Sequence, residues 1–430
     1  MMKTIQFAAG FFMSVFLTLA VPAFAQYDVL LKGGHVIDPK NGVDGIMDVA
    51  IAAGRVSAVA PEINPSRAKK AIDVRGLYVT PGVVDIHTHL FATTGIPNAW
   101  AGDKSVLPDG FSFRSGVTTM VDAGSAGWRN FEQFRQTVID RVKTRVFAFV
   151  NIVGLGMVSN FVEQDVKEMN PEQVARIAGK HKDVVVGVKT AHYEGRDWAS
   201  VDRAVEAGKL ANLPVMVDFG FFMAERPYWQ LVSQRLRPGD ISTHMYRSGV
   251  PWIDGNGKLL DYLRQARARG VKFDLGHGGG SLVFRNAVPA IQQKFYPDSI
   301  STDLHTDSMN GAMMDFPTVM SKMLAMGMSM AEIVLRSTWM PAEVIHHPEL
   351  GHLSVGSPAD VAVWEITKGE FGYADTSGGR LGGTQRVHCE MTLKDGAIVW
   401  DWNARGAVDY RTLGPSYGLR DGADYVIVPK

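Results

Sequence analysis

The sequence has a single cysteine, Cys389, among 430 residues, and it has no excess of charge of either sign. One cysteine excludes an intramolecular disulfide, and we interpret Cys389 as a small buried hydrophobic residue in a strand over 387–393. The 44 basic residues balance the 44 acidic residues, which argues against a nucleic-acid-binding surface or a basic membrane patch. A glycine-rich phosphate loop of the Rossmann type is also missing after the first strand of the central region.

The N-terminal segment 1–25 has the pattern of a cleavable signal peptide. Lys3 gives it a positive start, residues 5–21 are mostly apolar, and Ala-Phe-Ala at 23–25 matches the small-x-small cleavage pattern. The same pattern also fits an uncleaved membrane anchor, which is the alternative. A cleaved signal predicts a periplasmic or secreted protein with no membrane attachment after cleavage.

Strand-like runs gather at both ends of the remaining chain, where turn residues separate them. They lie within residues 27–80 and again from 360 to 400, with Asp395-Gly396 as a hairpin turn. We therefore expect residues 26–80 and 351–430 to form one small β-domain, a β-sandwich. The polar and glycine-containing stretch 368–386 is interpreted as a long loop.

The central region 81–350 alternates strand-like runs with helix-like runs. The strand-like runs are Val83–His89, Val117–Asp122, Arg145–Ile152, Val184–Lys189, Pro214–Asp218, Ile241–Tyr246, Val271–His277 and Ser299–Leu304. This alternation predicts an α/β fold, a (β/α)8 TIM-like barrel whose site lies at the C-terminal ends of the strands. An open doubly wound parallel sheet is the main rival.

The first of these runs ends in Asp85-Ile86-His87-Thr88-His89. Residues two apart in a strand point to the same side, so His87 and His89 would present two imidazoles together. Two neutral imidazoles at the end of a strand form half of a transition-metal site. Taken alone, the pair also fits two neighbouring structural histidines, and the other strand ends have to decide between these interpretations.

Most of the later runs close with a polar residue that could bind a metal. These residues are Lys189, Asp218, His244, His277 and Asp303. Lys189 follows an apolar stretch, where a lone ammonium is costly and tends to lose its proton. A neutral amine can react with carbon dioxide to form a carbamate that bridges two metal ions. Pairing with a carboxylate, or reaching solvent, is the simpler alternative. Asp303 could bind a metal and accept a proton from water, or it could only cap a turn.

These motifs resemble the amidohydrolase superfamily, and within it the amidohydrolase/deacetylase metallohydrolases, which are similar to dihydroorotases. The resemblance covers essentially the whole chain after the signal segment. It rests on Pro81–His89, Val121–Gly127, Leu236–His244, Asp274–Ser281, Ser301–His305 and Leu353–Asp360. It implies one or two divalent metal ions, most often zinc.

The resemblance also implies roles for individual residues. His87, His89 and Asp303 would hold the more buried ion. Lys189, as N6-carboxylysine, would bridge to a second ion that His244 also binds. Asp303 would be the catalytic residue that accepts the proton.

Two positions depart from the family pattern. Asp218 stands where the family has a histidine, so as a metal ligand it would make the second site weaker, give it another metal preference or leave it empty. The arginine expected two residues after Lys189 is absent from Thr190-Ala191-His192, which changes the pocket. We expect His192 and His277 to contact substrate, with a structural hydrogen bond as the alternative for His277.

The expected function is a metal-dependent hydrolase of amide or ester bonds in small acylated molecules, such as N-acyl amino acids, acetyl esters of hydroxy acids or dipeptides. A cyclic amidase of the dihydroorotase or hydantoinase type would use the same residues. A non-catalytic periplasmic binding protein on the same barrel is the alternative from another class. The expected partner is a small-molecule substrate, and homo-oligomer formation is left open.

Overall fold

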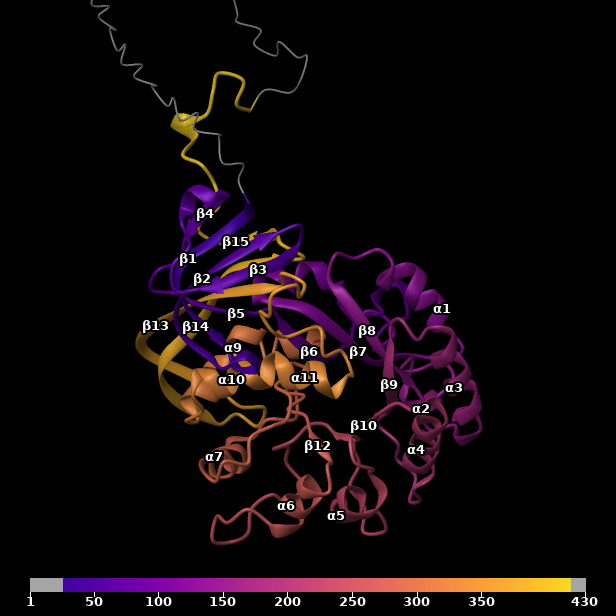
Figure 1. Cartoon of the computed structure of the whole chain (residues 1–430). Helices are drawn as coiled ribbons and strands as arrows, with labels where there is room; N and C mark the ends of the chain where they lie inside the picture. The colour runs from indigo at the N-terminus through magenta and orange to yellow at the C-terminus, as the bar shows by residue number, and fades with distance from the viewer. Residues whose placement is uncertain (1–25, 419–430) are drawn as a thin grey trace, which may run out of the picture.

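A computed structural model describes residues 26–418 of the chain (Figure 1). The signal segment expected at 1–25 lies outside the described residues. The fold is mixed α/β and contains two sheets, one mostly antiparallel and one fully parallel. No helix within 26–418 is both long and apolar enough to cross a lipid bilayer.

The first sheet combines strands from both ends of the described chain, in the order β15-β14-β13-β5-β1-β2-β3, with β4 paired to β1. Its strands are β1 (Tyr27–Asp38), β2 (Val43–Ala52), β3 (Arg55–Ala60), β4 (Ala68–Asp73), β5 (Tyr78–Pro81), β13 (Val361–Ala374), β14 (Arg380–Lys394) and β15 (Ala397–Asp401). The two halves meet where β5 pairs with β13 in antiparallel fashion. The free thiol of Cys389 is buried on β14.

The hairpin of β13 and β14 corrects the loop expected at 368–386. The two strands pair continuously from Val361 to Ala374 apart from two irregularities, and Figure 1 shows the hairpin curving away from the rest of its sheet. The glycines and exposed polar residues of this stretch hide the strand signal, because a two-stranded ladder that extends past the core has no buried face to impose alternation. Backbone hydrogen bonds between β13 and β14, rather than burial of one face, hold this stretch in strand conformation.

The second sheet consists of parallel strands that follow one another in space as they do in sequence, from β6 to β12. They are β6 (Val83–Thr88), β7 (Val117–Gly127), β8 (Arg145–Asn151), β9 (Val185–Thr190), β10 (Val215–Val217), β11 (Ile241–Ser242) and β12 (Lys272–Phe273). A doubly wound sheet reverses its strand order at a switch point, and this sheet has no reversal. In Figure 1 the strands fan around from β6 to β12, so the sheet is curled.

The last expected run, 299–304, forms isolated pairings rather than a regular strand. Ser299 makes a parallel bridge to Asp274, which follows β12, and Leu304 makes one to Thr88 at the end of β6. This segment therefore contacts both outer strands of the parallel sheet. It also carries Asp303 to the strand-end face of β6.

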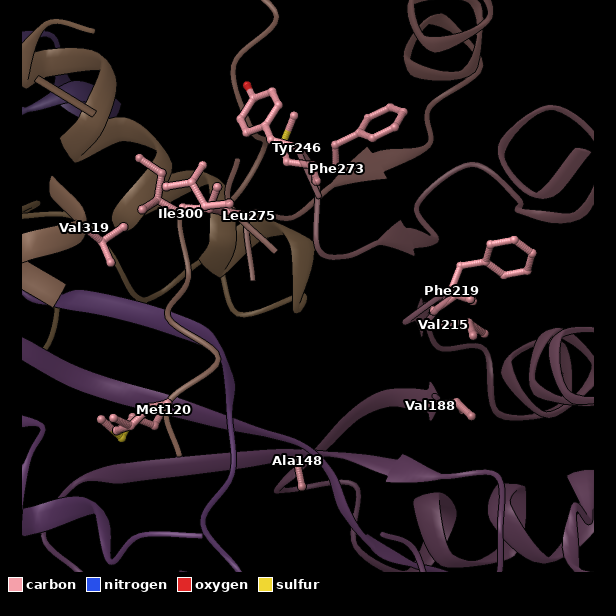
Figure 2. Close-up of a cluster of buried hydrophobic side chains, with 14 of the residues drawn as sticks. Met120, Ala148, Val188, Val215, Phe219, Tyr246, Phe273, Leu275, Ile300 and Val319 are labelled. Atoms are coloured by element: carbon pink, nitrogen blue, oxygen red, sulfur yellow. The ribbon is translucent and has the colours of Figure 1, made fainter. Parts of the chain in front are cut away.

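Helices connect and cover the parallel strands. They are α1 (Phe131–Phe134), α2 (Asn160–Glu163), α3 (Pro171–Lys180), α4 (Ala199–Ala211), α5 (Tyr228–Gln230), α6 (Asp261–Ala268), α7 (Phe284–Gln292), α8 (Thr306–Met309), α9 (Phe316–Ala325), α10 (Met330–Ser337) and α11 (Trp339–Val344). A continuous apolar cluster joins strand residues such as Met120, Ala148 and Val188 to the helices (Figure 2). Every residue of β7 and β9 is buried, as expected for strands covered on both faces.

Candidate metal centre and active site

Three side chains that could bind a metal converge at the end of β6. His87, His89 and Asp303 are buried, and one ligand atom from each lies within 4.8 Å of the others. Asp303 Oδ1 is 3.1 Å from His89 Nε2 and 3.5 Å from His87 Nε2. Within residues 26–418 no other group of three histidine, cysteine or acidic side chains meets this distance criterion.

The donor atoms of this trio fit a divalent cation. Asp303 Oδ1 is buried and accepts no hydrogen bond from any described residue, which is costly for a carboxylate oxygen without a cation beside it. The Nδ1 atoms of the two histidines, which do not face Asp303, are in hydrogen-bond contact with hydroxyl groups. His89 Nδ1 lies 2.9 Å from Ser125 Oγ, and His87 Nδ1 lies 2.8 Å from Thr243 Oγ1. Such partners fix the ring orientation of metal-binding histidines.

Backbone geometry around the trio is unusual. Asp303 and His244 have φ values of 52° and 59°, in the left-handed region that residues other than glycine seldom adopt. Gly278 has a φ of 51°, and a Cβ atom there would lie 2.2 Å from Asp303 Oδ2. Only glycine lets this loop approach the carboxylate so closely. Strained positions of this kind concentrate at functional sites.

Lys189, at the end of β9, points into the same cluster. Its Nζ lies 3.1 Å from His87 Nε2, and the side chain is fully buried. Burial lowers the pKa of the ammonium, and this effect outweighs the nearby carboxylates, of which Asp218 is the strongest. The amine therefore loses its proton more readily than an exposed lysine.

Asp218 and His244 lie beside the trio. They do not form a second group of three possible metal ligands with any other described residue. Asp218 Oδ2 is 3.3 Å from His244 Nε2, while Arg247 donates a 2.9 Å hydrogen bond to Asp218 Oδ1. Burial alone raises the pKa of Asp218, but its neighbours, led by His244, hold the pKa well below its usual range. His244 Nδ1 lies 2.7 Å from Ser281 Oγ and 2.7 Å from the Gly276 carbonyl.

His192 sits between two carboxylates. Its Nδ1 is 3.1 Å from Glu163 Oε1 and its Nε2 is 3.3 Å from Asp218 Oδ2. Burial lowers the pKa of His192, but Glu163 and Asp218 outweigh it and raise the pKa to about 10. His192 is therefore a cation bound on both sides, and its expected substrate contact stays a prediction.

Both ring nitrogens of His277 contact other described groups. It is fully buried, with Nε2 2.9 Å from Lys322 Nζ and Nδ1 3.0 Å from the Gly278 carbonyl. Burial and the neighbouring Lys322 lower its pKa to about 3. These contacts match the structural alternative for His277, and its substrate role stays a prediction.

Sequence reasoning missed several residues of the site. Arg247 binds Asp218, and Asp274 accepts hydrogen bonds from Thr243, Ser299 and Ser301 behind His87. Trp100 packs its ring 4.9 Å from that of His89 and 4.1 Å from that of His305. Asp274 lies within the expected strand run Val271–His277, and the structure places it directly after β12. Arg247 and Trp100 lie in loops, where spacing carries no signal.

The comparisons with known proteins are consistent with this geometry. No family model matches the chain. A deacetylase from Brucella anthropi is 32% identical over 348 residues, covering 78% of this chain and 83% of that protein. A deacetylase from Enterococcus faecalis is 30% identical over 382 residues, covering 87% and 99%.

Solved structures extend the similarity to the fold. The crystal structure of an adenine deaminase superposes with a TM-score of 0.79 at 28% identity, covering 87% of this chain and all of that one. A dihydroorotase structure superposes with a TM-score of 0.76 at 28% identity, covering 87% and 99%. Relatives of this identity and coverage, together with the His87–His89–Asp303 cluster, show that the chain belongs to the amidohydrolase superfamily of metal-dependent hydrolases, as its motifs predict.

Proposed function

We propose that this protein removes the acyl group from a small N-acylated or O-acylated molecule by metal-dependent hydrolysis. The observation that carries the proposal is the buried cluster of His87, His89 and Asp303, with an unpartnered carboxylate oxygen at its centre among the described residues. The deacetylase names of the relatives from Brucella anthropi and Enterococcus faecalis support an acyl bond as the target.

The trio is suited to zinc, because two imidazoles and one carboxylate are a common ligand set of hydrolytic zinc sites. When bound, the ion polarises the scissile carbonyl and lowers the pKa of a bound water towards ~7. Asp303 accepts the proton of the attacking water and returns it to the leaving amine or alkoxide. Burial raises the pKa of Asp303, but His305 and His87 outweigh it, so the carboxylate is ionised and ready to accept.

Trp100 gives the site an aromatic wall. Its ring packs against His89 on one side and against His305 on another, and it lies 6.1 Å from the ring of His192. An apolar surface beside the ligand histidines excludes water from the reacting carbonyl and favours a short acyl chain there.

Lys189 is proposed to carry a carbamate. Its neutral amine bonds through nitrogen to the carbon of carbon dioxide, one carbon–oxygen electron pair moves to oxygen, and the nitrogen releases one proton to solvent. The product is an anion beside His87, where an unmodified ammonium would repel a cation. Incubation with carbon-13 bicarbonate should give a carbamate NMR signal that the Lys189→Met variant lacks.

A single ion is the proposed stoichiometry. The guanidinium of Arg247 already neutralises Asp218, and a second divalent cation there would face this fixed positive charge. Asp218 therefore works with Arg247 as a pair that borders the pocket. The family histidine that Asp218 replaces would have left this position free for metal.

Two broader features belong to the same proposal. We infer that segment 299–304 closes the parallel sheet into a (β/α)8 barrel, which its bridges to Asp274 and Thr88 support. We also infer that the protein works outside the cytoplasm, as the signal-like segment at 1–25 suggests. An exported hydrolase would meet acylated small molecules before uptake.

The test is metal analysis joined to a substrate screen. Purified protein should contain about one equivalent of zinc, and chelation should abolish hydrolysis that added zinc restores. The screen should compare N-acetyl amino acids and acetyl esters of hydroxy acids with dihydroorotate and hydantoin. Protein that binds no divalent metal, or that opens only the cyclic imides, would overturn the proposal.

A further inference from the structure

A cavity of about 630 Å³ lies between α9 and the β13–β14 hairpin, apart from the metal centre. Its lining includes Arg114, Lys322, Arg386, His388, Trp400 and Trp402. None of the residues assigned to the metal centre contributes to it. Its volume falls within the range of about 300–1,000 Å³ that small-molecule sites occupy in proteins.

The two arginines of this cavity form no ion pair within residues 26–418. Neither the Arg114 nor the Arg386 side chain forms an ion pair or a hydrogen bond with any described residue, and Lys322, whose ammonium contacts His277 and the Ala312 carbonyl, forms no ion pair. Arg386 instead lies 4.5 Å above the ring of Phe371. Guanidinium groups held in this way keep their donors available for a carboxylate.

The acidic residues of the cavity do not offset this charge. Asp315 accepts the backbone N–H of Thr318 at the start of α9. Asp375 accepts the backbone N–H groups of Phe284, Ser377 and Gly379. Both carboxylates keep their charge, but the cavity lining sets three cations, Arg114, Lys322 and Arg386, against these two acids and so has an excess of positive charge.

Aromatic side chains form the other part of the wall. Trp402 is 53% exposed, which is unusual for so large an apolar ring, and its nearest aromatic neighbour is His388 at 5.5 Å. Trp400 lies on β15, and its indole N–H is held by the Cys389 carbonyl, so its ring position is fixed. Indole faces attract flat rings by stacking and by burial of apolar surface.

We propose that this cavity binds a small aromatic carboxylate. The ring packs on the two tryptophans, Trp400 and Trp402, and the carboxylate is bound by the guanidinium of Arg386. The site is separate from the metal centre, and the inference does not rest on the reaction proposed there.

The experiment is calorimetric titration of the full protein with indole-3-acetate. Binding is expected, and indole and acetate alone should each bind far more weakly. Arg386→Met keeps the apolar length of the side chain and should weaken binding by about 10–100-fold, the effect of losing a charge-assisted hydrogen bond. Arg176→Met, which removes an exposed cation on α3, should bind as the unmodified protein does.

Trp402→Ala provides a second, independent variant, because this exposed side chain is not part of the core. It should also weaken indole-3-acetate binding, and Asp303→Asn should leave it unchanged, which separates this site from the metal centre. Equal affinity in Arg386→Met and the unmodified protein would overturn the proposal. So would the absence of binding, or a dimer in solution whose formation the Trp402→Ala variant abolishes.

Discussion

Arg247 donates a 2.9 Å hydrogen bond to Asp218, the residue for which the resemblance to the family implies a histidine. We expect Arg247→Met to release Asp218 Oδ1 and to raise the metal content of the protein above one equivalent, because one of the two positive charges beside Asp218 is removed and only that of His192 remains. Elemental analysis after equilibration with zinc measures this. Arg264→Met, on the exposed face of α6, is the matched control and should leave the content unchanged. Two equivalents in the unmodified protein would contradict the single-ion proposal.

Asp303→Asn tests the proton acceptor. The amide keeps the size of the side chain but does not accept a proton, so turnover should fall by about 10²–10⁴-fold or more. Circular dichroism should remain native, and most of the metal should be retained because His87 and His89 are intact. Asp307→Asn, an exposed residue on α8, should keep full activity. Near-normal turnover in Asp303→Asn would remove Asp303 from the proposed role.

Gly278→Ala tests the close approach of the loop to the carboxylate. A Cβ atom 2.2 Å from Asp303 Oδ2 has to displace that group, and alanine is strained at a φ of 51°. We expect a loss of about 1–3 kcal/mol in the free energy of unfolding, together with weaker zinc binding. Gly280→Ala is the control from the same loop, since a Cβ there meets no atom within 4 Å. If both variants bind zinc equally, the geometry does not constrain Asp303.

Lys322 predicts a pH dependence of stability. Burial, partly opposed by Asp375 and Asp315, lowers its pKa from 10.5 to about 8. The unfolded chain therefore binds more protons between pH 8 and 10.5, and this group adds stability as the pH rises through that window. Below pH 8 both states are protonated and the contribution is constant.

The measurement is urea unfolding of the unmodified protein and of Lys322→Met at several pH values. Between pH 8 and 10.5, the free energy of unfolding of the unmodified protein should increase by about 3 kcal/mol relative to that of Lys322→Met. The Lys322→Met variant also loses the contact to His277, which shifts the difference by an amount independent of pH. A difference that does not change with pH would contradict the lowered pKa.

The parallel sheet and the metal cluster could be anticipated from sequence because their signals are local. An unbroken apolar run marks a strand buried on both faces, and the polar residue that ends it stands at the strand-end face. His87 and His89 carry their two-residue period within one expected run, which the structure forms as β6 and the residue after it, while Asp303 lies in a mixed run that forms only isolated bridges. The structure places the three together.

What the sequence could not predict depends on contacts between distant segments. The β13–β14 hairpin has no buried face along much of its length, so its glycines imply a loop until the pairing is seen. Arg247 reaches Asp218 through a long flexible side chain, and nothing in its own neighbourhood indicates that partner. The surroundings of His277 depend on Lys322, which α9 supplies from outside the strands.

The pairing of β5 with β13 has a consequence for biosynthesis. A nascent chain that has produced Tyr78–Pro81 still lacks Val361–Ala374, so the edge of β5 stays open while all of the parallel sheet is being made. An open edge can pair with another chain. Translation products that stop before β13 should therefore aggregate, and the pairing of β5 with β13 should form after the pairing among β1 to β5, once both halves of the sheet have been made.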